Sequence, residues 1–487
     1  MTSSLTTKTV SGIFWNGIQK FSTLGIQLLI TIVIARILSP EDYGLIGMLS
    51  IFTALGIVIL DSGFGQALIR KQDATDTDYS TIFFLQIILG LVIYAILFSL
   101  SPLIAEFYNT PRLENIAKII FLVFPLNSLG LIHSTLLKKQ LRFKSYAKTT
   151  IISSLISGII GIVLAYNGMG VWTLVIQMLS QTLLLNVFVW FIIKWKPAFK
   201  FNYLSIKEIA PFSLSLLGIG IIKIIARNIY TLLIGKFYPL NEVGFYNQAK
   251  RFEEIPTQSI TGIIQNVSYP VLSTKQTDDI KLRLGYRKII TQTMFIITPL
   301  MLILLASADN LFYVLLTEKW MPAVPYFRLL CIFGLLYPLH SINENILKVK
   351  GKGKKLVILE VIKNVFLFVS ILITLKMNVA ALLIGSILTS LISVLINMHY
   401  CGKEIEYSTF DQIKDIAPIA FVSILASFLT WIISFVEMNV YLLLTIQLLT
   451  GTLVFIILSS FFKLESFRIM KNIVNTKFRK NRSDLHN

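Results

Sequence analysis

Long apolar segments, each about the length of a membrane-spanning helix, constrain this chain more than any other feature. They lie at about 12–35, 43–64, 80–104, 114–137, 148–166, 170–193, 208–235, 246–268, 287–307, 326–347, 356–376, 379–400, 416–436 and 440–462. A helix needs ~20 predominantly apolar residues to cross the hydrocarbon core of a bilayer. The pattern therefore predicts an all-α polytopic membrane protein with about 14 transmembrane helices.

The composition agrees with this prediction and excludes other classes. Of the 487 residues, 55% are hydrophobic and 14% are charged, whereas soluble domains carry about 25% charged residues. A soluble enzyme, a coiled coil and a disordered chain are excluded. The two cysteines, Cys331 and Cys401, have no metal or redox spacing. We expect no metal and no cofactor.

The basic residues follow the expected topology. The chain has 44 Lys and Arg against 25 Asp and Glu, a net charge of +19. When alternate loops are assigned to opposite sides, about 31 basic residues fall on the side of both termini and about 6 on the other. This bias predicts that both termini are cytoplasmic, and it also suits contacts with the anionic lipids of an inner leaflet. Nucleic-acid binding is not needed to explain the charge.

Two pairs of similar stretches indicate an internal repeat. TIVIARILSPEDYG at 31–44 matches TLLIGKFYPLNEVG at 231–244, and FPLNS at 124–128 matches YPLHS at 337–341. The first match makes the polar segment 246–268 the counterpart of 43–64, so we count it as a helix. The repeat predicts two pseudo-symmetric six-helix lobes facing a central cavity. The expected parts are an N-lobe at 1–205, a C-lobe at 206–402, and two extra helices with a basic cytoplasmic tail at 403–487.

Polar side chains recur at spacings of three and four residues on three predicted spans, which places them on one helix face each. They are Asn16, Lys20, Thr23 and Gln27 on the first span, Lys223 and Arg227 on the seventh, and Arg251, Glu254, Gln258 and Gln265 on the eighth. Ionisable groups in a bilayer face water, a partner or a ligand. We expect a cavity in which Lys20, Lys223, Arg227 and Arg251 bind an anionic substrate. The alternative is polar packing between helices, with Arg251 neutralised by Glu254.

Other ionisable residues favour structural roles. Asp61, in LDSGFG, is expected at a helix end or gate rather than in an ion site. Glu344 shares a face with His340, but an interfacial pair with Lys348 is the favoured interpretation. His133 is expected to be a satisfied histidine between helices.

Several stretches carry a family resemblance: ILSPEDYGLIGMLSIF, DSGFGQALIRKQDATDTDYSTIFF, SPLIAEFYNTPRL and KKQLRFKSYAK. They resemble the Wzx-type polysaccharide flippases of the MOP (MATE-like) superfamily, in the colanic-acid and teichuronic-acid branch. The likeness is strong over about 10–210 and mainly topological to about 400. It implies flipping of undecaprenyl-diphosphate-linked oligosaccharides from the inner to the outer leaflet by alternating access. It also implies a role in surface polysaccharide or O-antigen biosynthesis, beside a polysaccharide polymerase machinery. The family has no fixed motif for cavity cations, so those residues rest on periodicity alone.

Two rival functions are considered. A cation-coupled multidrug antiporter of the same fold is expected to place unpaired carboxylates in its cavity, and here the cations outnumber candidate acids. A membrane polysaccharide polymerase is expected to need a large external catalytic loop, whereas every predicted loop is short. A transporter that is not an enzyme is the favoured prediction.

Overall fold

The computed structural model describes residues 2–472, and their regular structure is helical throughout. The helices are α1 (Thr2–Ile37), α2 (Pro40–Asp61), α3 (Phe64–Arg70), α4 (Asp76–Phe107), α5 (Arg112–Ile120), α6 (Val123–Lys139), α7 (Phe143–Tyr166), α8 (Val171–Ile192), α9 (Tyr203–Phe237), α10 (Leu240–Ser273), α11 (Asp279–Ala306), α12 (Ala308–Leu316), the 3₁₀ helix η1 (Glu318–Ala323), α13 (Val324–Val349), α14 (Gly353–Thr374), α15 (Val379–Lys403), α16 (Thr409–Ile433) and α17 (Val440–Phe461). This confirms the predicted all-α fold.

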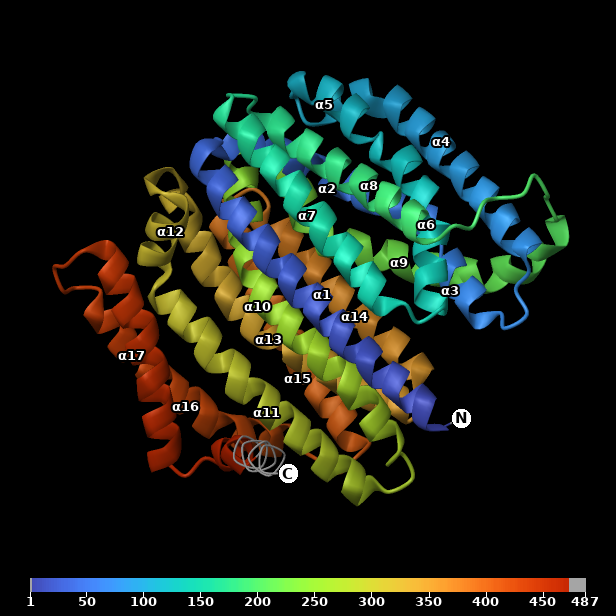
Figure 1. The fold of residues 1–487 in the computed structure, drawn as a ribbon. Coiled ribbons are helices and arrows are strands. Elements are labelled where there is room, and N and C mark those ends of the chain that lie inside the picture. The colour runs from blue at the N-terminus through green and yellow to red at the C-terminus, as the bar shows by residue number, and fades with distance from the viewer. Residues whose placement is uncertain (1, 473–487) are drawn as a thin grey trace, which may run out of the picture. The chain divides into compact units, whose positions relative to one another are not determined.

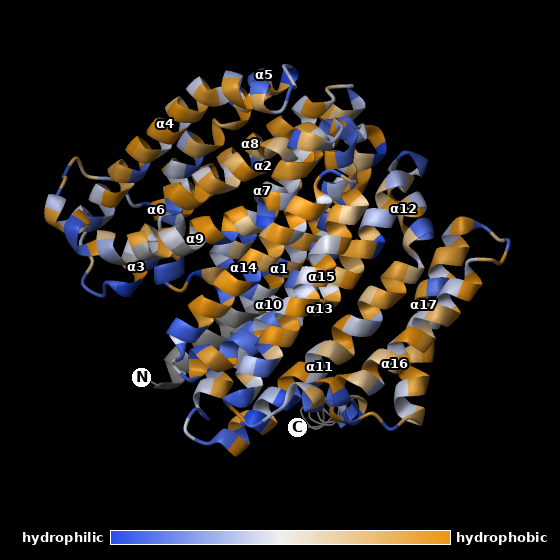
Figure 2. Cartoon of the chain, turned by 180° about the vertical axis from the view of Figure 1, so that it is seen from behind, coloured by the Kyte–Doolittle hydropathy of each residue, from blue (hydrophilic) through white to orange (hydrophobic). Residues whose placement is uncertain are grey.

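Within residues 2–472, 13 helical segments are long and apolar enough to cross a membrane. Each corresponds to one of the predicted spans, and the remaining prediction, 246–268, falls within α10. That helix has 34 residues, but it falls outside the apolar set, because charged residues in its first half are followed by polar ones such as Gln258 and Gln265 in its second half. Figure 2 shows apolar residues running along the helices, while hydrophilic residues gather in many of the connections. The count of 14 is compatible with this structure, provided that α10 also crosses.

Capping boxes define where several helices begin. The Ser39 side chain accepts a hydrogen bond from the backbone N–H of Asp42, whose carboxylate accepts from Ser39 N at 3.1 Å. The same reciprocal arrangement precedes α4 and α16. Such caps satisfy N–H groups that have no partner within the helix. They therefore place the first turns of these helices at defined residues.

The predicted repeat appears in the helix boundaries. α1 and α9 end 200 residues apart, and α2 and α10 begin 200 residues apart. The two matched glycines make reciprocal contacts. Gly44 lies against the backbone carbonyl of Leu240, and Gly244 lies against the backbone carbonyl of Pro40. A side chain at either glycine would meet that carbonyl. The sequence identity at Gly44 and Gly244 thus reflects a close, two-fold-like crossing of two helix starts.

The second repeat match leads to two turns of the same kind. After α6, the N–H groups of Leu141 and Arg142 donate to the carbonyls of Lys138 and Leu137. After α13, the corresponding bonds lie 210 residues further along the chain. Leu141 and Gly351 both adopt positive φ, at 56° and 66°, which is the conformation that this type of helix C-cap requires. α7 and α14 each start two residues later.

The chain divides into two compact units, one ending at Asn247 and the other starting at Gln248. In the first unit, α1 packs along α7 (Figure 1), α7 packs on α8, α4 packs on α6, and α2 packs on α9. In the second unit, α11 packs against α13 and α16, and α15 packs against α13 and α14. The lobe boundaries expected at residues 205 and 402 stay a prediction.

Candidate functional site

The predicted polar side chains of α1 lie on one face of the helix, and exposed apolar side chains lie on the opposite face. Asn16 and Lys20 are exposed, and Thr23 and Gln27 are partly buried. At 100° per residue, the exposed side chains of Phe21 and Leu29 point to roughly the opposite side of the helix. Exposed apolar side chains can face lipid, whereas the charged side chain of a lysine in a membrane span faces lipid only at a large free-energy cost. The Lys20 face is therefore the one expected to border water.

The α9 stripe is arranged in the same way. Lys223 and Arg227 are both exposed, one turn apart. The exposed side chains of Leu214 and Ile225 lie on roughly the opposite side of the helix. Both residues lie within the candidate membrane span Leu216–Phe237. Because two cations in a span cannot face hydrocarbon without a large free-energy cost, the face that carries them is expected to border an aqueous or polar region. This is the strongest feature of the predicted cavity.

α10 is helical, as the repeat predicted, and it is polar along one face. Arg251 is exposed, and Glu254, Gln258 and Gln265 are partly buried. A further carboxylate, that of Glu253, is only 4% exposed and lies against α13 at Gly334, where a side chain would collide with it. The α1 and α9 stripes belong to the first unit and these α10 residues to the second. Whether all four cations line one cavity stays a prediction.

Two further predictions concern single residues. Asp61 is the last residue of α2 and is followed by Ser62 in a left-handed conformation, while a gate role stays a prediction. His133 Nε2 lies 3.3 Å from the carbonyl oxygen of Trp195, and its ring stacks on that of Trp190. Nε2 of His133 thus has the expected backbone partner, whereas its buried Nδ1 has no hydrogen-bond partner among the described residues.

The predicted pair of Glu344 with Lys348 is confirmed, with 3.5 Å between Oε2 and Nζ. The second partner of Glu344, Lys363 of α14, was not predicted from the sequence. The spacing of Glu360 and Lys363, three residues apart in an apolar helix, was an available signal. The ion pair between Lys363 and Glu344 has no such signal in the sequence, because it joins two different helices.

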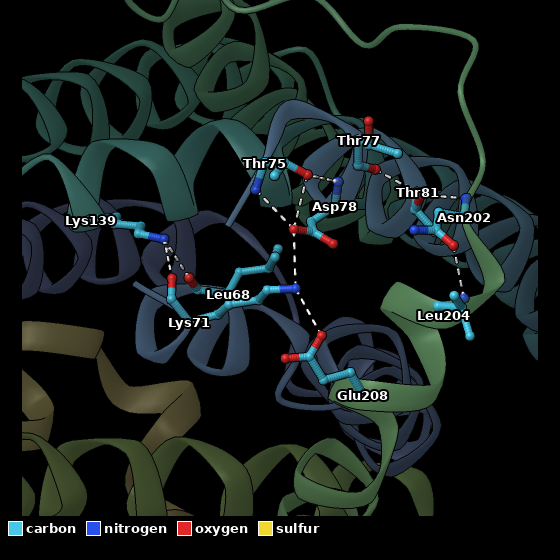
Figure 3. Close-up of polar contacts among 10 residues, drawn as sticks. All are labelled: Leu68, Lys71, Thr75, Thr77, Asp78, Thr81, Lys139, Asn202, Leu204 and Glu208. Carbon is cyan, nitrogen blue, oxygen red and sulfur yellow. Dashed lines mark hydrogen bonds and ion pairs between the residues drawn. The ribbon is translucent and has the colours of Figure 1, made fainter. Parts of the chain in front are cut away.

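An ion-pair junction that involves α3, α4, α6 and α9 was not predicted from the sequence (Figure 3). Lys71 Nζ lies 2.9 Å from Glu208 of α9 and 3.3 Å from Asp78 of α4. The hydrogen bond with Glu208 raises the pKa of Lys71. Lys139 Nζ of α6 donates to the carbonyls of Leu68 and Lys71 at the end of α3. The junction therefore ties four helices together through residues far apart in sequence.

A cavity of about 420 Å³ opens within the second unit among α11, α13 and α16. Its lining is mainly apolar: Leu302, Leu305, Ala306, Arg328, Ile424, Ser427, Phe428 and Trp431. Arg328 pairs with Asp309 of α12. The predicted cations do not line this cavity. In the part of the chain that the structure describes, no group of three or more His, Cys, Asp or Glu is placed to hold a metal ion.

Comparisons with known proteins identify relatives over most of the chain. The teichuronic acid biosynthesis protein TuaB of Bacillus subtilis is 27% identical over 358 residues, which cover 72% of this chain and 73% of that protein. The lipopolysaccharide biosynthesis protein WzxC of Escherichia coli is 26% identical over 415 residues, which cover 84% of each chain.

The fold is also found in solved structures. The lipid II flippase MurJ, in an inward closed conformation, superposes with a TM-score of 0.73 at 20% identity, over 92% of this chain and 98% of that chain. An inward-facing multidrug resistance transporter of the MATE family, in the MOP superfamily, has a TM-score of 0.59 at 16% identity, over 79% of this chain and 94% of that chain. Since these identities are low, the two structures establish the fold alone.

The polysaccharide biosynthesis protein family matches residues 33–325, which is more than half of the chain. This range includes the reciprocal glycine contact, the Lys71 junction and the α9 cation stripe. The chain is a multi-pass membrane protein that belongs to the polysaccharide biosynthesis protein family.

Proposed function

We propose that this protein transports a lipid-linked oligosaccharide across the bacterial cytoplasmic membrane, from the inner to the outer leaflet, by alternating access. The substrate is a diphosphate-linked glycan whose lipid tail stays in the bilayer. Family membership and the biosynthetic relatives support the polysaccharide class. The fold is shared with multidrug transporters, so it does not discriminate between the two functions. A transport role, rather than catalysis, suits both sets of relatives.

The observation that carries the anionic part of the substrate is the α9 stripe. Lys223 and Arg227 are exposed on a face opposite to apolar exposed residues. A diphosphate is the kind of group that such paired cations bind, and Arg binds phosphate oxygens through two parallel hydrogen bonds. We assign Lys20 and Arg251 to the same cavity. Polar side chains on α1 and α10 would contact the sugars.

The orientation adds a driving force. We place both termini in the cytoplasm, because about 31 of the 44 basic residues then lie on the inner side. The inside-negative membrane potential then favours outward movement of the anionic substrate, by about 2.3 kcal/mol per charge per 100 mV. A polymerase that acts on the exported unit is the expected functional partner.

The test is complementation of a strain that lacks the protein. Lys223→Ala and Arg227→Ala are expected to be inserted at wild-type levels but to lose surface polysaccharide. Lys376→Ala is the matched control, because Lys376 is an exposed lysine in the connection between α14 and α15. If both α9 variants restore wild-type amounts of polymer, the cation assignment is wrong.

A further inference from the structure

A short segment rich in lysines and aromatic residues connects α8 to α9. Residues 194–207 read KWKPAFKFNYLSIK, and we call them the basic–aromatic segment. They include four lysines and four aromatic residues but no acid. The next residue, Glu208, is an acid that already pairs with Lys71, at 2.9 Å. The positive charge of the segment is therefore not balanced by an acid of its own.

One side of the basic–aromatic segment is fastened to the start of α4. The backbone N–H of Ala198 donates to Ser80 Oγ at 3.0 Å. The backbone N–H of Asn202 donates to Thr81 Oγ1, also at 3.0 Å (Figure 3). The Trp195 ring packs edge-on against two aromatic rings of α4, with centroid distances of 5.9 and 6.3 Å. The protein itself thus holds the backbone of the segment in place.

The opposite side of the basic–aromatic segment is exposed. Phe199 is 98% exposed, Phe201 is 60% exposed, and Tyr203 and Leu204 are each 69% exposed. The four lysines are exposed as well: Lys194, Lys196, Lys200 and Lys207. Large exposed apolar side chains that are grouped together and bordered by charged ones are typical of a surface that contacts a partner or a membrane.

The basic–aromatic segment lies where membrane spans begin and end. α8 ends the candidate span Val171–Ile192, and the candidate span in α9 begins only at Leu216. α9 has 35 residues, so it is ~52 Å long at 1.5 Å per residue, whereas the hydrocarbon core is ~30 Å thick. Its first turns therefore extend to the membrane boundary. Figure 1 shows the connection as a green loop beside the start of α4.

The topology assigns this boundary to one leaflet. Six candidate spans lie between the N-terminus and the basic–aromatic segment. Because each crossing changes side, the segment lies on the side of the N-terminus, which we place in the cytoplasm. The cytoplasmic leaflet carries anionic lipids that attract basic segments. Aromatic rings favour the membrane–water interface, and lysine stems lie along apolar surface while their ammonium groups reach the headgroups.

We propose that the basic–aromatic segment binds anionic phospholipids of the cytoplasmic leaflet and anchors the start of α9 at the membrane surface. Its exposed aromatic side chains insert beside the headgroups, and its lysine ammonium groups contact lipid phosphates. Because the bonds to α4 already hold the backbone, little conformational entropy is lost on binding. The anchor fixes the start of the helix that carries Lys223 and Arg227. It rests on the proposed topology but not on transport, so the two can fail separately.

The test uses the full-length protein with Phe201→Cys labelled by the fluorophore NBD, which keeps an apolar group at that position. Cys331 and Cys401 are buried, so the label reacts at residue 201. The protein is reconstituted in vesicles of equal amounts of phosphatidylglycerol and phosphatidylcholine. A nitroxide on the acyl chains of one lipid or the other quenches the fluorophore. Nitroxide on phosphatidylglycerol is expected to quench more strongly, because the anionic lipid is enriched around the segment.

Two triple variants with the same change in net charge separate this segment from the basic surface as a whole. Replacement of three segment lysines by glutamine is expected to abolish the excess quenching: Lys194→Gln, Lys196→Gln and Lys200→Gln. The matched control removes three exposed lysines of the second unit and is expected to keep the excess: Lys288→Gln, Lys352→Gln and Lys354→Gln. Added salt should reduce the excess without any substitution, because it screens the attraction.

Equal quenching by the two labelled lipids, or an excess that survives in the segment variant, would overturn lipid binding by the lysines. Emission typical of water, with no quenching by either lipid, would overturn the anchor and favour a cytoplasmic protein as the partner of this surface. A protein that shows the excess but does not flip lipid-linked oligosaccharide would overturn the proposed function and support the anchor.

Discussion

The close crossing of α2 and α10 makes a specific prediction about Gly244. A methyl group at this position would lie 2.8 Å from the carbonyl carbon of Pro40 and closer still to its oxygen. Carbon atoms in ordinary contact are ~3.5–4.0 Å apart, so the two helix starts would have to separate by at least about 0.7 Å. Overpacking of this kind typically costs about 1–3 kcal/mol. Gly244→Ala is therefore expected to destabilise the protein despite the better helix propensity of alanine.

The matched control is Gly25→Ala in α1. The same methyl group there meets no atom within 4 Å, and alanine is favoured over glycine in a helix by up to about 1 kcal/mol. Thermal unfolding of the purified full-length protein in detergent should give a lower melting temperature for Gly244→Ala and an unchanged or higher one for Gly25→Ala. Gly44→Ala, which meets Leu240 in the reciprocal position, should behave like Gly244→Ala. Equal melting temperatures for all three variants and the wild type would refute the close crossing.

Two other perturbations test contacts within each unit. Tyr286→Phe removes a buried hydroxyl that lies 2.8 Å from Asn343 and 3.1 Å from Gln412, and leaving such groups unsatisfied costs about 1–3 kcal/mol. A clear fall in melting temperature is expected, and an unchanged value would show that these bonds contribute nothing. Glu208→Gln weakens the ion pair with Lys71, but the Glu208 side chain is 63% exposed, so the loss should stay below about 1 kcal/mol. That loss should shrink further at high salt, and a salt-independent loss would contradict a surface ion pair.

The helical architecture could be predicted because a bilayer allows few solutions for a long apolar segment. The repeat added information that hydropathy could not supply. The charge-rich start of α10, with Arg251 and Glu254, argues against a span, but the match of Gly244 to Gly44 identifies the helix. Those glycines are informative because a close backbone approach tolerates no side chain there.

The parts that were not predicted depend on contacts between distant segments. Lys71 and Glu208 are 137 residues apart, and neither has a spacing that points to the other. Glu344 was assigned only its local partner, because i,i+4 pairs can be read from a sequence, whereas Lys363 reaches it from another helix. Periodicity predicted which face of α9 is polar, but it could not establish what that face binds.

The most direct test of the account is the leaflet distribution of lipid-linked oligosaccharide in cells depleted of this protein. The proposed function predicts that the intermediate accumulates on the cytoplasmic leaflet while surface polysaccharide is lost. Normal lipid-linked intermediates and normal surface glycans, together with increased sensitivity to cationic drugs, would contradict it and favour the multidrug antiporter.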